Sequence, residues 1–151
     1  MLRYKILKCE SNLKDKNQKT YSMVEIGTEL GKFTGIAYLH EGDDFSNFLG
    51  CSIAESKAYR KYLKRKIANT KERIIELKNL MKMLDCCKRH NRKSFESRRI
   101  WRRFCELREE LDTYISLYDS CSTATETNLA KRDKVIRDLK LQHQLAARSK
   151  K

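Results

Sequence analysis

The chain has 151 residues, of which 34 are lysine or arginine and 20 are aspartate or glutamate, giving a formal net charge of +14. Apolar residues make up 40% of the sequence, which is too many for a disordered chain, and a charged fraction of 36% is too high for one compact globule. No stretch approaches the roughly 18 consecutive apolar residues of a membrane-spanning helix, and Met1–Glu10 does not resemble a secretion signal. We therefore expect a cytoplasmic protein that has no membrane partner.

The net positive charge comes entirely from the second part of the chain. Residues 1–50 contain seven basic and seven acidic side chains, whereas residues 51–151 contain 27 basic and 13 acidic ones. All five glycines fall in the first part, and the chain has no proline, so long helices can continue without a forced break. The composition predicts a charge-neutral region at 1–50, a basic helical region at 51–147 and a flexible basic tail at 148–151.

Residues 1–50 show the alternation of short β-strands. Leu2–Cys9, Tyr21–Ile26 and Lys32–Leu39 alternate apolar with polar side chains and are rich in branched and aromatic residues. Ser11–Lys19 is polar and turn-like, and Gly27–Gly31 marks a hairpin bend. We expect a small antiparallel sheet. Because three strands are about the minimum for independent stability, we also expect a helix across its apolar face.

The basic region has a helical period. Ser52–Glu55 matches a capping box, in which serine and glutamate side chains satisfy free amides at a helix start. Two sets of seam residues then follow at alternating spacings of four and three. These are Leu63, Ile67, Thr70, Ile74, Leu77, Met81 and Leu84, and then Ile100, Phe104, Leu107, Leu111, Tyr114, Tyr118 and Cys121. Together with the polar segment His90–Ser97 between them, the two seams predict a coiled-coil-like antiparallel hairpin.

A third helix is expected to follow the hairpin. Thr123–Glu126 is another capping box, and the helical pattern continues to about Leu145, either as a separate helix or as a bent continuation. The predicted fold class is α+β: a small antiparallel sheet, then a long basic helical hairpin and a third helix. The seams either pack against each other within one chain or form a homodimer.

The densest basic segment is Lys88–Arg103, at the tip of the predicted hairpin, where Glu96 is the single acid. Arginine makes bidentate phosphate contacts and aromatic rings stack on unpaired bases, so this composition is typical of a nucleic-acid surface. The predicted binding residues are Lys88, Arg89, Arg92, Lys93, Arg98, Arg99, Trp101, Arg102 and Arg103. A solvated helix face and a surface for an acidic protein are the alternatives.

A secondary basic patch lies near the start of the basic region. It comprises Lys57, Arg60, Lys61, Lys64 and Arg65. Two tyrosines, Tyr59 and Tyr62, alternate with these cations. Because both lie beside Leu63, where the first seam begins, we expect them to pack on the sheet and not to stack on bases.

Neither a catalytic site nor a metal site is predicted. Cys86, Cys87 and His90 lie close together, but a structural zinc site needs four ligands and the chain has no matching Cys-x-x-Cys pair. The segment His40–Asp44 could hold magnesium, although Asp43 or Asp44 more simply caps a helix. We expect reduced cysteines, no cofactor and no enzymatic activity, and the role of the acidic segment stays open.

The junction between the two regions carries a family resemblance. Gly35–Gly50, followed by Ile53–Ala58, reads as a strand, an acidic loop and a helix, and it resembles junctions in small phage-encoded proteins of Gram-positive hosts. The resemblance covers residues 35–58 and assigns no catalytic residue. It implies a phage-type protein in the host cytoplasm that binds nucleic acid or inhibits a nucleoprotein machine such as a CRISPR effector.

These observations predict a non-enzymatic basic protein whose helical arm binds DNA, RNA or a nucleoprotein complex. One alternative is an inhibitor that blocks a host defence nuclease through protein contacts, an anti-CRISPR candidate. A second alternative is a structural protein that self-associates through the heptad seams.

Overall fold

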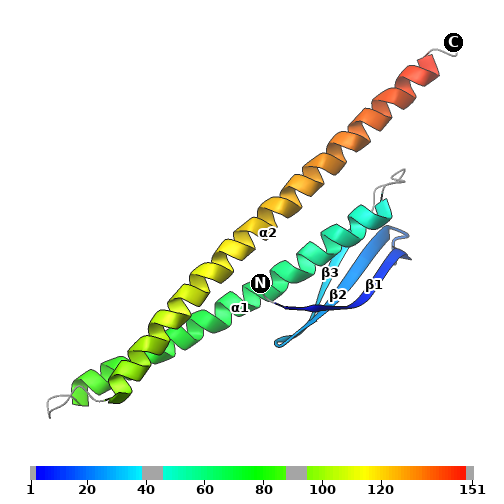
Figure 1. Cartoon of the computed structure of the whole chain (residues 1–151). Coiled ribbons are helices and arrows are strands. Elements are labelled where there is room, and N and C mark those ends of the chain that lie inside the picture. Colours follow the sequence, from blue (N-terminus) through cyan, green and yellow to red (C-terminus); the bar gives the residue numbers. More distant parts are fainter. Residues whose placement is uncertain (1–2, 39–45, 88–94, 149–151) are drawn as a thin grey trace. The chain divides into compact units, whose positions relative to one another are not determined.

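The structure, a computed structural model, describes residues 3–38, 46–87 and 95–148 (Figure 1). Three strands, β1 (Lys5–Lys14), β2 (Thr20–Thr28) and β3 (Gly31–Tyr38), precede two long helices in these residues, α1 (Ser46–Cys87) and α2 (Phe95–Arg148). The fold class is α+β, as predicted.

The strands form one antiparallel sheet in the order β1-β2-β3. β1 is longer than predicted, because part of the polar segment expected to be a turn pairs with β2, as Leu13 does with Tyr21. The turn itself is short. One carboxylate oxygen of Asp15 accepts hydrogen bonds from the backbone amides of Asn17 (2.9 Å) and Lys19 (2.8 Å). These hydrogen bonds close the turn, and the flanking residues pair with the neighbouring strand.

The predicted bend between β2 and β3 is confirmed. The Thr28 hydroxyl donates to the Gly31 carbonyl at 2.9 Å and accepts from the Leu30 amide at 3.1 Å. Gly31 has a φ of 110°, a conformation that residues with a side chain rarely adopt. Glycine at this position therefore permits the tight connection.

The first turns of α1 cover one face of the sheet, as expected (Figure 1). The buried side chains are Ser22, Val24, Ile26 and Ala37 from the sheet and Ile53, Ala54 and Ala58 from the helix. The contact is very close at Gly35, where an added Cβ would lie 1.8 Å from the backbone oxygen of Ala54. Glycine on the strand and alanines on the helix allow the two backbones to approach.

By its internal contacts, the chain divides into two compact units. One comprises Met1–Lys61 with Ser120–Lys151, and the other is Tyr62–Asp119. The compositional change near residue 50 does not mark this division, because α1 begins at Ser46 and contributes residues to both units.

The second unit is an antiparallel pair of helices packed through the predicted seams. Ile74, Phe104 and Leu107 form its buried core, and partly buried apolar residues pack around them: Leu77, Met81, Cys105 and Leu111. Every seam residue named from the sequence is buried or half-buried. The seam prediction is confirmed within one chain, so a homodimer through the seams would first have to separate these helices.

The helix start predicted at Ser52 is wrong, and of the two alternatives after the hairpin the continuation is observed. The capping-box pattern Ser52–Glu55 lies inside α1, and Thr123–Glu126 lies inside α2. The helix expected after the hairpin is therefore the continuation of α2, which contains neither glycine nor proline from Phe95 to Arg148. Threonine is accommodated in these helices because its hydroxyl bonds to a carbonyl of the preceding turn, as Thr113 does to Glu109 at 2.9 Å.

Replacing Gly35 with alanine tests the helix–sheet contact. The new Cβ meets backbone atoms of α1, which cannot move aside locally, so we expect the free energy of unfolding to fall by about 3 kcal/mol. Gly27→Ala is the matched control. Its Cβ meets only the end of the Leu7 side chain, at 2.9 Å, so a loss below about 1 kcal/mol is expected. Urea denaturation followed by circular dichroism measures both, and equal losses would contradict the close contact.

Truncating the helix–helix core tests the seam. Leu107 is 2% exposed, so Leu107→Ala should lower the free energy of unfolding by about 3 kcal/mol. Leu77→Ala should cost less, because Leu77 is only partly buried, and Leu80→Ala should change stability by about 0.5 kcal/mol or less, because Leu80 is 45% exposed. Chemical denaturation ranks the three variants, and a different order would show that the seam packs otherwise.

Candidate nucleic-acid interface

The predicted basic surface falls partly on the first turns of α2. Four of its residues, Lys88, Arg89, Arg92 and Lys93, lie outside the described residues. The other five are all exposed: Arg98, Arg99, Trp101, Arg102 and Arg103. They lie off the apolar seam, as their heptad positions predict.

Arg103 differs from the other arginines because it is held by carboxylates of its own helix. Its Nη1 lies 3.0 Å from an oxygen of Glu106 and 3.5 Å from an oxygen of Glu110. The hydrogen bond to Glu106 is the main cause that raises the pKa of Arg103. Since two acids offset its charge, Arg103 contributes less to an anion-binding surface than its position in the sequence suggests.

Trp101 is an exposed aromatic residue whose ring packs on a buried residue. Its side chain is 58% exposed, and its ring stacks on Phe104 with centroids 5.5 Å apart and planes inclined by 26°. Phe104 is 6% exposed and belongs to the helix–helix core with Ile74 and Leu107. The indole is thus held at the border of the core while much of its surface stays open to a ligand.

Three arginines lie close to Trp101 along the helix. Arg98, Arg99 and Arg102 are exposed, and none of them forms an ion pair with another described side chain. Arg98 and Arg102 are four residues apart, so they lie on one face of α2, and Arg98 is one turn before Trp101. We call Arg98, Arg99, Trp101 and Arg102 the tip surface.

Charge is balanced near the base of the hairpin but not at its tip. Lys66 lies 5.6 Å from the ring of Tyr114 and Lys78 lies 5.9 Å from that of Phe104, so segment 64–73 of α1 runs opposite the residues around 106–119 of α2. The first segment has five basic residues and one acid, and the second has five acids and one basic residue. Lys88–Arg103 has eight basic residues and one acid. The excess charge of this unit therefore concentrates at the tip.

The secondary basic patch is not a single surface. Lys57 donates to the Ile36 carbonyl at 3.0 Å and Lys61 donates to the Thr34 carbonyl at 2.7 Å. These two lysines satisfy carbonyls of β3, the edge strand, so they serve the fold. Arg60 is half-buried, whereas Lys61, Lys64 and Arg65 are exposed.

Sequence reasoning missed this role of the lysines, although a signal existed. Lys57 and Lys61 each follow by three residues an alanine that packs on the sheet, Ala54 and Ala58. Residues three apart on a helix share a face, so the small residues and the lysines approach the same strand.

The two tyrosines of α1 differ in burial, and the half-buried Tyr59 lies beside the start of the sheet region, as expected. Tyr62 is fully buried, and the Tyr59 ring lies 5.2 Å from that of Tyr4 at the start of the sheet. The Tyr4 hydroxyl donates to a carboxylate oxygen of Glu55 at 2.6 Å. Burial, and then this bond, raise the pKa of Tyr4 far above its ordinary value. This polar contact joins the first residues of the sheet region to α1.

No cysteine with a described side chain forms a disulfide. The Cys9 thiol shares a hydrogen bond with Cys51, which is the main cause that raises its pKa. The side chains of Cys86 and Cys87, together with His90 and the segment His40–Asp44, lie outside the described residues. Among the described residues, His, Cys, Asp and Glu side chains form no group of three that could hold a metal ion.

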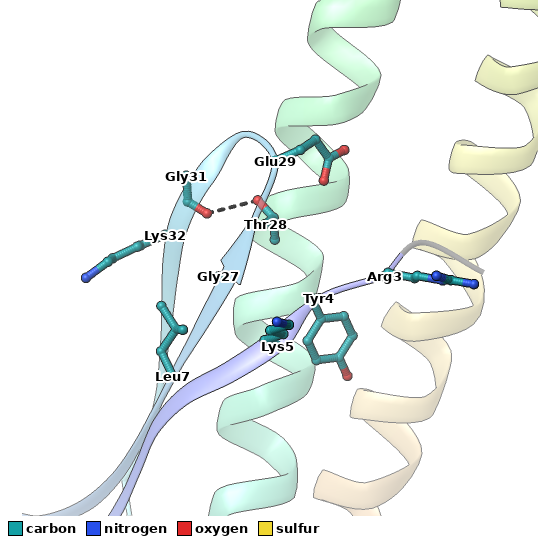
Figure 2. Close-up of a pocket in the computed structure, with 9 residues that line it drawn as sticks. All are labelled: Arg3, Tyr4, Lys5, Leu7, Gly27, Thr28, Glu29, Gly31 and Lys32. Carbon is teal, nitrogen blue, oxygen red and sulfur yellow. Dashed lines mark hydrogen bonds between the residues drawn. The ribbon is translucent and has the colours of Figure 1, made fainter.

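A cavity of about 1200 Å³ opens where the β2–β3 bend meets the start of β1 (Figure 2). Leu7 and Gly27 line it close to each other, and the Thr28 hydroxyl donates to the Gly31 carbonyl. Arg3 and Lys32 line the cavity but point away from each other (Figure 2). Arg3 and Lys32 therefore do not converge on one anionic group.

None of the described helices contains an apolar stretch long enough to cross a bilayer. Comparison with protein-family models, with curated proteins and with solved structures found no match. The resemblance of residues 35–58 to phage-encoded proteins accordingly stays a prediction.

Proposed function

We propose that this chain is a non-enzymatic nucleic-acid-binding protein and that its tip surface contacts the nucleic acid. The observation that carries the proposal is that three exposed arginines, without ion-pair partners among the described residues, neighbour an exposed tryptophan whose ring stacks on Phe104. Arginines bind phosphates, and an indole stacks on unpaired bases. The charge balance at the base of the hairpin favours the tip over the rest of this unit as the site of contact.

The tip surface supports binding that depends strongly on salt. Each phosphate contact releases condensed counterions, so the logarithm of affinity falls with the logarithm of salt concentration by about 0.9 per contact on duplex DNA. Six contacts across Lys88–Arg103 would give a slope of about −5. The three arginines of the tip surface are described residues that lie off the seam. Mutating them should therefore remove their share of the salt slope without changing the seam.

Replacing Arg98, Arg99 and Arg102 together by glutamine should therefore weaken DNA binding and make the salt slope shallower by roughly 2 to 3. The helix and its core should persist, because the three side chains are exposed. Gel shifts at several salt concentrations, with duplex and single-stranded DNA and with RNA, measure the slope. Circular dichroism confirms the fold.

The matched control removes the same charge elsewhere: Lys64, Arg65 and Lys71, all exposed on α1, are replaced by glutamine. This control should keep most of the salt slope. An equal or larger loss in the control would locate binding on α1 and contradict the tip surface. Weak binding of the parent to every nucleic acid, together with loss of an acidic protein partner in the arginine variant, would favour the inhibitor alternative.

Trp101→Ala separates stacking from charge. Stacking of one base on an aromatic side chain contributes about 1–3 kcal/mol, so affinity for single strands should fall by about 5- to 150-fold. Duplex binding should change little, because paired bases offer no free face. Fluorescence anisotropy with labelled single-stranded and duplex oligonucleotides compares the two. Phe48→Ala is the control, since Phe48 is an 87% exposed aromatic residue far from the tip in sequence. Equal losses on both forms of DNA would contradict stacking.

A further inference from the structure

A bulge in β1 places a cysteine on the face of the sheet that α1 covers. Ile6 pairs with Ile26 on β2. Cys9, three residues further along β1, pairs with Val24, which is only two residues away from Ile26. The extra residue in β1 reverses the alternation of the strand, so Cys9 lies across from the buried Val24 and shares its face. Without the bulge, Lys8 would occupy this position.

A cysteine of α1 lies over the same row of paired residues. Val24 pairs in turn with Gly35, and Gly35 packs closely on Ala54 of α1. Cys51 is three residues before Ala54, so the two lie on the same side of the helix. The row across the sheet and the helix above it therefore place Cys9 and Cys51 on the same side of the sheet.

The directions of the elements bring the two cysteines to the same height. The two lysines of α1 that bond to β3 meet its carbonyls in reverse order, so α1 runs antiparallel to β3. Since β1 and β3 are both antiparallel to β2, β1 also runs antiparallel to α1. The Tyr4 hydroxyl bonds to Glu55 at 2.6 Å, and Cys9 follows Tyr4 along β1 as Cys51 precedes Glu55 along α1.

The two thiols are in contact and are both reduced. Cys9 and Cys51 share a hydrogen bond between their side chains. Cys9 is exposed and Cys51 is half-buried, so a small oxidant has access to the pair from the side of β1. The other two cysteines with described side chains have different surroundings. Cys105 packs against the core of the helix pair, and the Cys121 thiol donates to the Ser56 carbonyl at 3.5 Å.

We propose that Cys9 and Cys51 form a reversible disulfide when the chain is exposed to a peroxide, and that this bond joins β1 to α1. One thiolate attacks an oxygen of the peroxide, the O–O bond breaks, and a sulfenic acid and one water are formed. The second sulfur attacks the first, the S–S bond forms, the S–O bond breaks and a second water leaves. The two cysteines lose two electrons to the peroxide, and their thiol protons end in the two waters.

The shared hydrogen bond affects both steps of this reaction. It is the main cause that raises the pKa of Cys9, and since thiolates react and thiols do not, the first step is slow with weak oxidants. It also holds the second sulfur beside the first. Thiols that already share a hydrogen bond need only a small side-chain rotation to reach the S–S length of about 2 Å. The disulfide should therefore form before a sulfur is oxidised further.

The disulfide would close a loop that contains most of the sheet. The chain between the two cysteines includes all of β2 and β3 and ends in the first turns of α1. Cross-linking a long loop restricts the unfolded chain and so stabilises the folded one. Oxidation should therefore stabilise this unit. The proposal is independent of the proposed function, because the tip surface belongs to the other unit.

Peptide mapping of the full chain tests the bond. Reduced protein is freed of reductant, treated with hydrogen peroxide, blocked at its remaining thiols and digested with trypsin. Trypsin cuts after lysine and arginine, so Cys9 lies in fragment 9–14 and Cys51 in fragment 33–57, each with a single cysteine. Mass spectrometry should find these two fragments joined, and dithiothreitol should separate them.

Thermal unfolding measures the consequence. The melting temperature of the parent should rise by about 5 °C or more after peroxide and return after dithiothreitol. Cys9→Ser and Cys51→Ser should each abolish the rise. Cys121→Ser is the matched control, since it removes another partly buried thiol and should keep the rise. Because Cys9 is exposed, Cys9→Ser should fold, and the peptide map requires no variant.

Three results would overturn the proposal. The first is a fragment 9–14 that stays unlinked after peroxide while circular dichroism shows folded protein, or that links to a fragment with another cysteine. The second is an equal rise of the melting temperature in Cys9→Ser. The third is joined fragments found only in a covalent dimer on non-reducing electrophoresis, because the bond would then lie between two chains.

Discussion

The packing of α1 against α2 is the contact on which the basic part of this chain depends. Ile74, Phe104 and Leu107 are buried between the helices, and the remaining seam residues line the same interface. A two-helix layer has only one apolar stripe per helix, so most other positions face water and carry charge. This geometry explains how a chain that is 36% charged still has an ordered core.

The same packing sorts the charges along the hairpin. Near the base, the basic segment 64–73 of α1 runs opposite the acidic segment 106–119 of α2, and the two compensate each other. Arg103 turns toward Glu106 and Glu110 and so belongs with the balanced part. Trp101, held by Phe104, lies where the compensation ends. The proposed function rests on this difference in charge compensation between the base and the tip of the hairpin more than on the total charge.

In the other unit, close backbone packing takes the place of a large apolar core. Gly35 lets the backbone of β3 approach Ala54 and Ala58, and this proximity brings Lys57 and Lys61 to the strand edge. The small residues allow the close approach of helix and strand, and the two lysines bond to the strand that this approach brings near. The opposite face of the sheet has no role in this contact.

The sequence alone determined the features that depend on local period: three strands, two matched seams, an antiparallel hairpin and the location of excess charge. Apolar residues at every second position identify the buried face of a strand, and apolar residues spaced by three and four identify that of a helix. These patterns hold whichever partner the element packs against. The exact helix starts were not predictable in this way, because Ser52 and Thr123 have the chemistry of caps whether or not a helix already passes through them. α1 in fact begins at Ser46, before this pattern.

Only the tertiary structure decided which basic residues are available to a partner. Lys57 and Lys61 look like members of a basic patch until their distance to the carbonyls of β3 is known, and Arg103 looks equivalent to Arg102 until its carboxylate partners are placed. A charged side chain reaches several ångströms in many directions. Its partner is therefore set by which backbone or carboxylate oxygens the fold brings within that reach, and this information is not contained in the local pattern of the sequence.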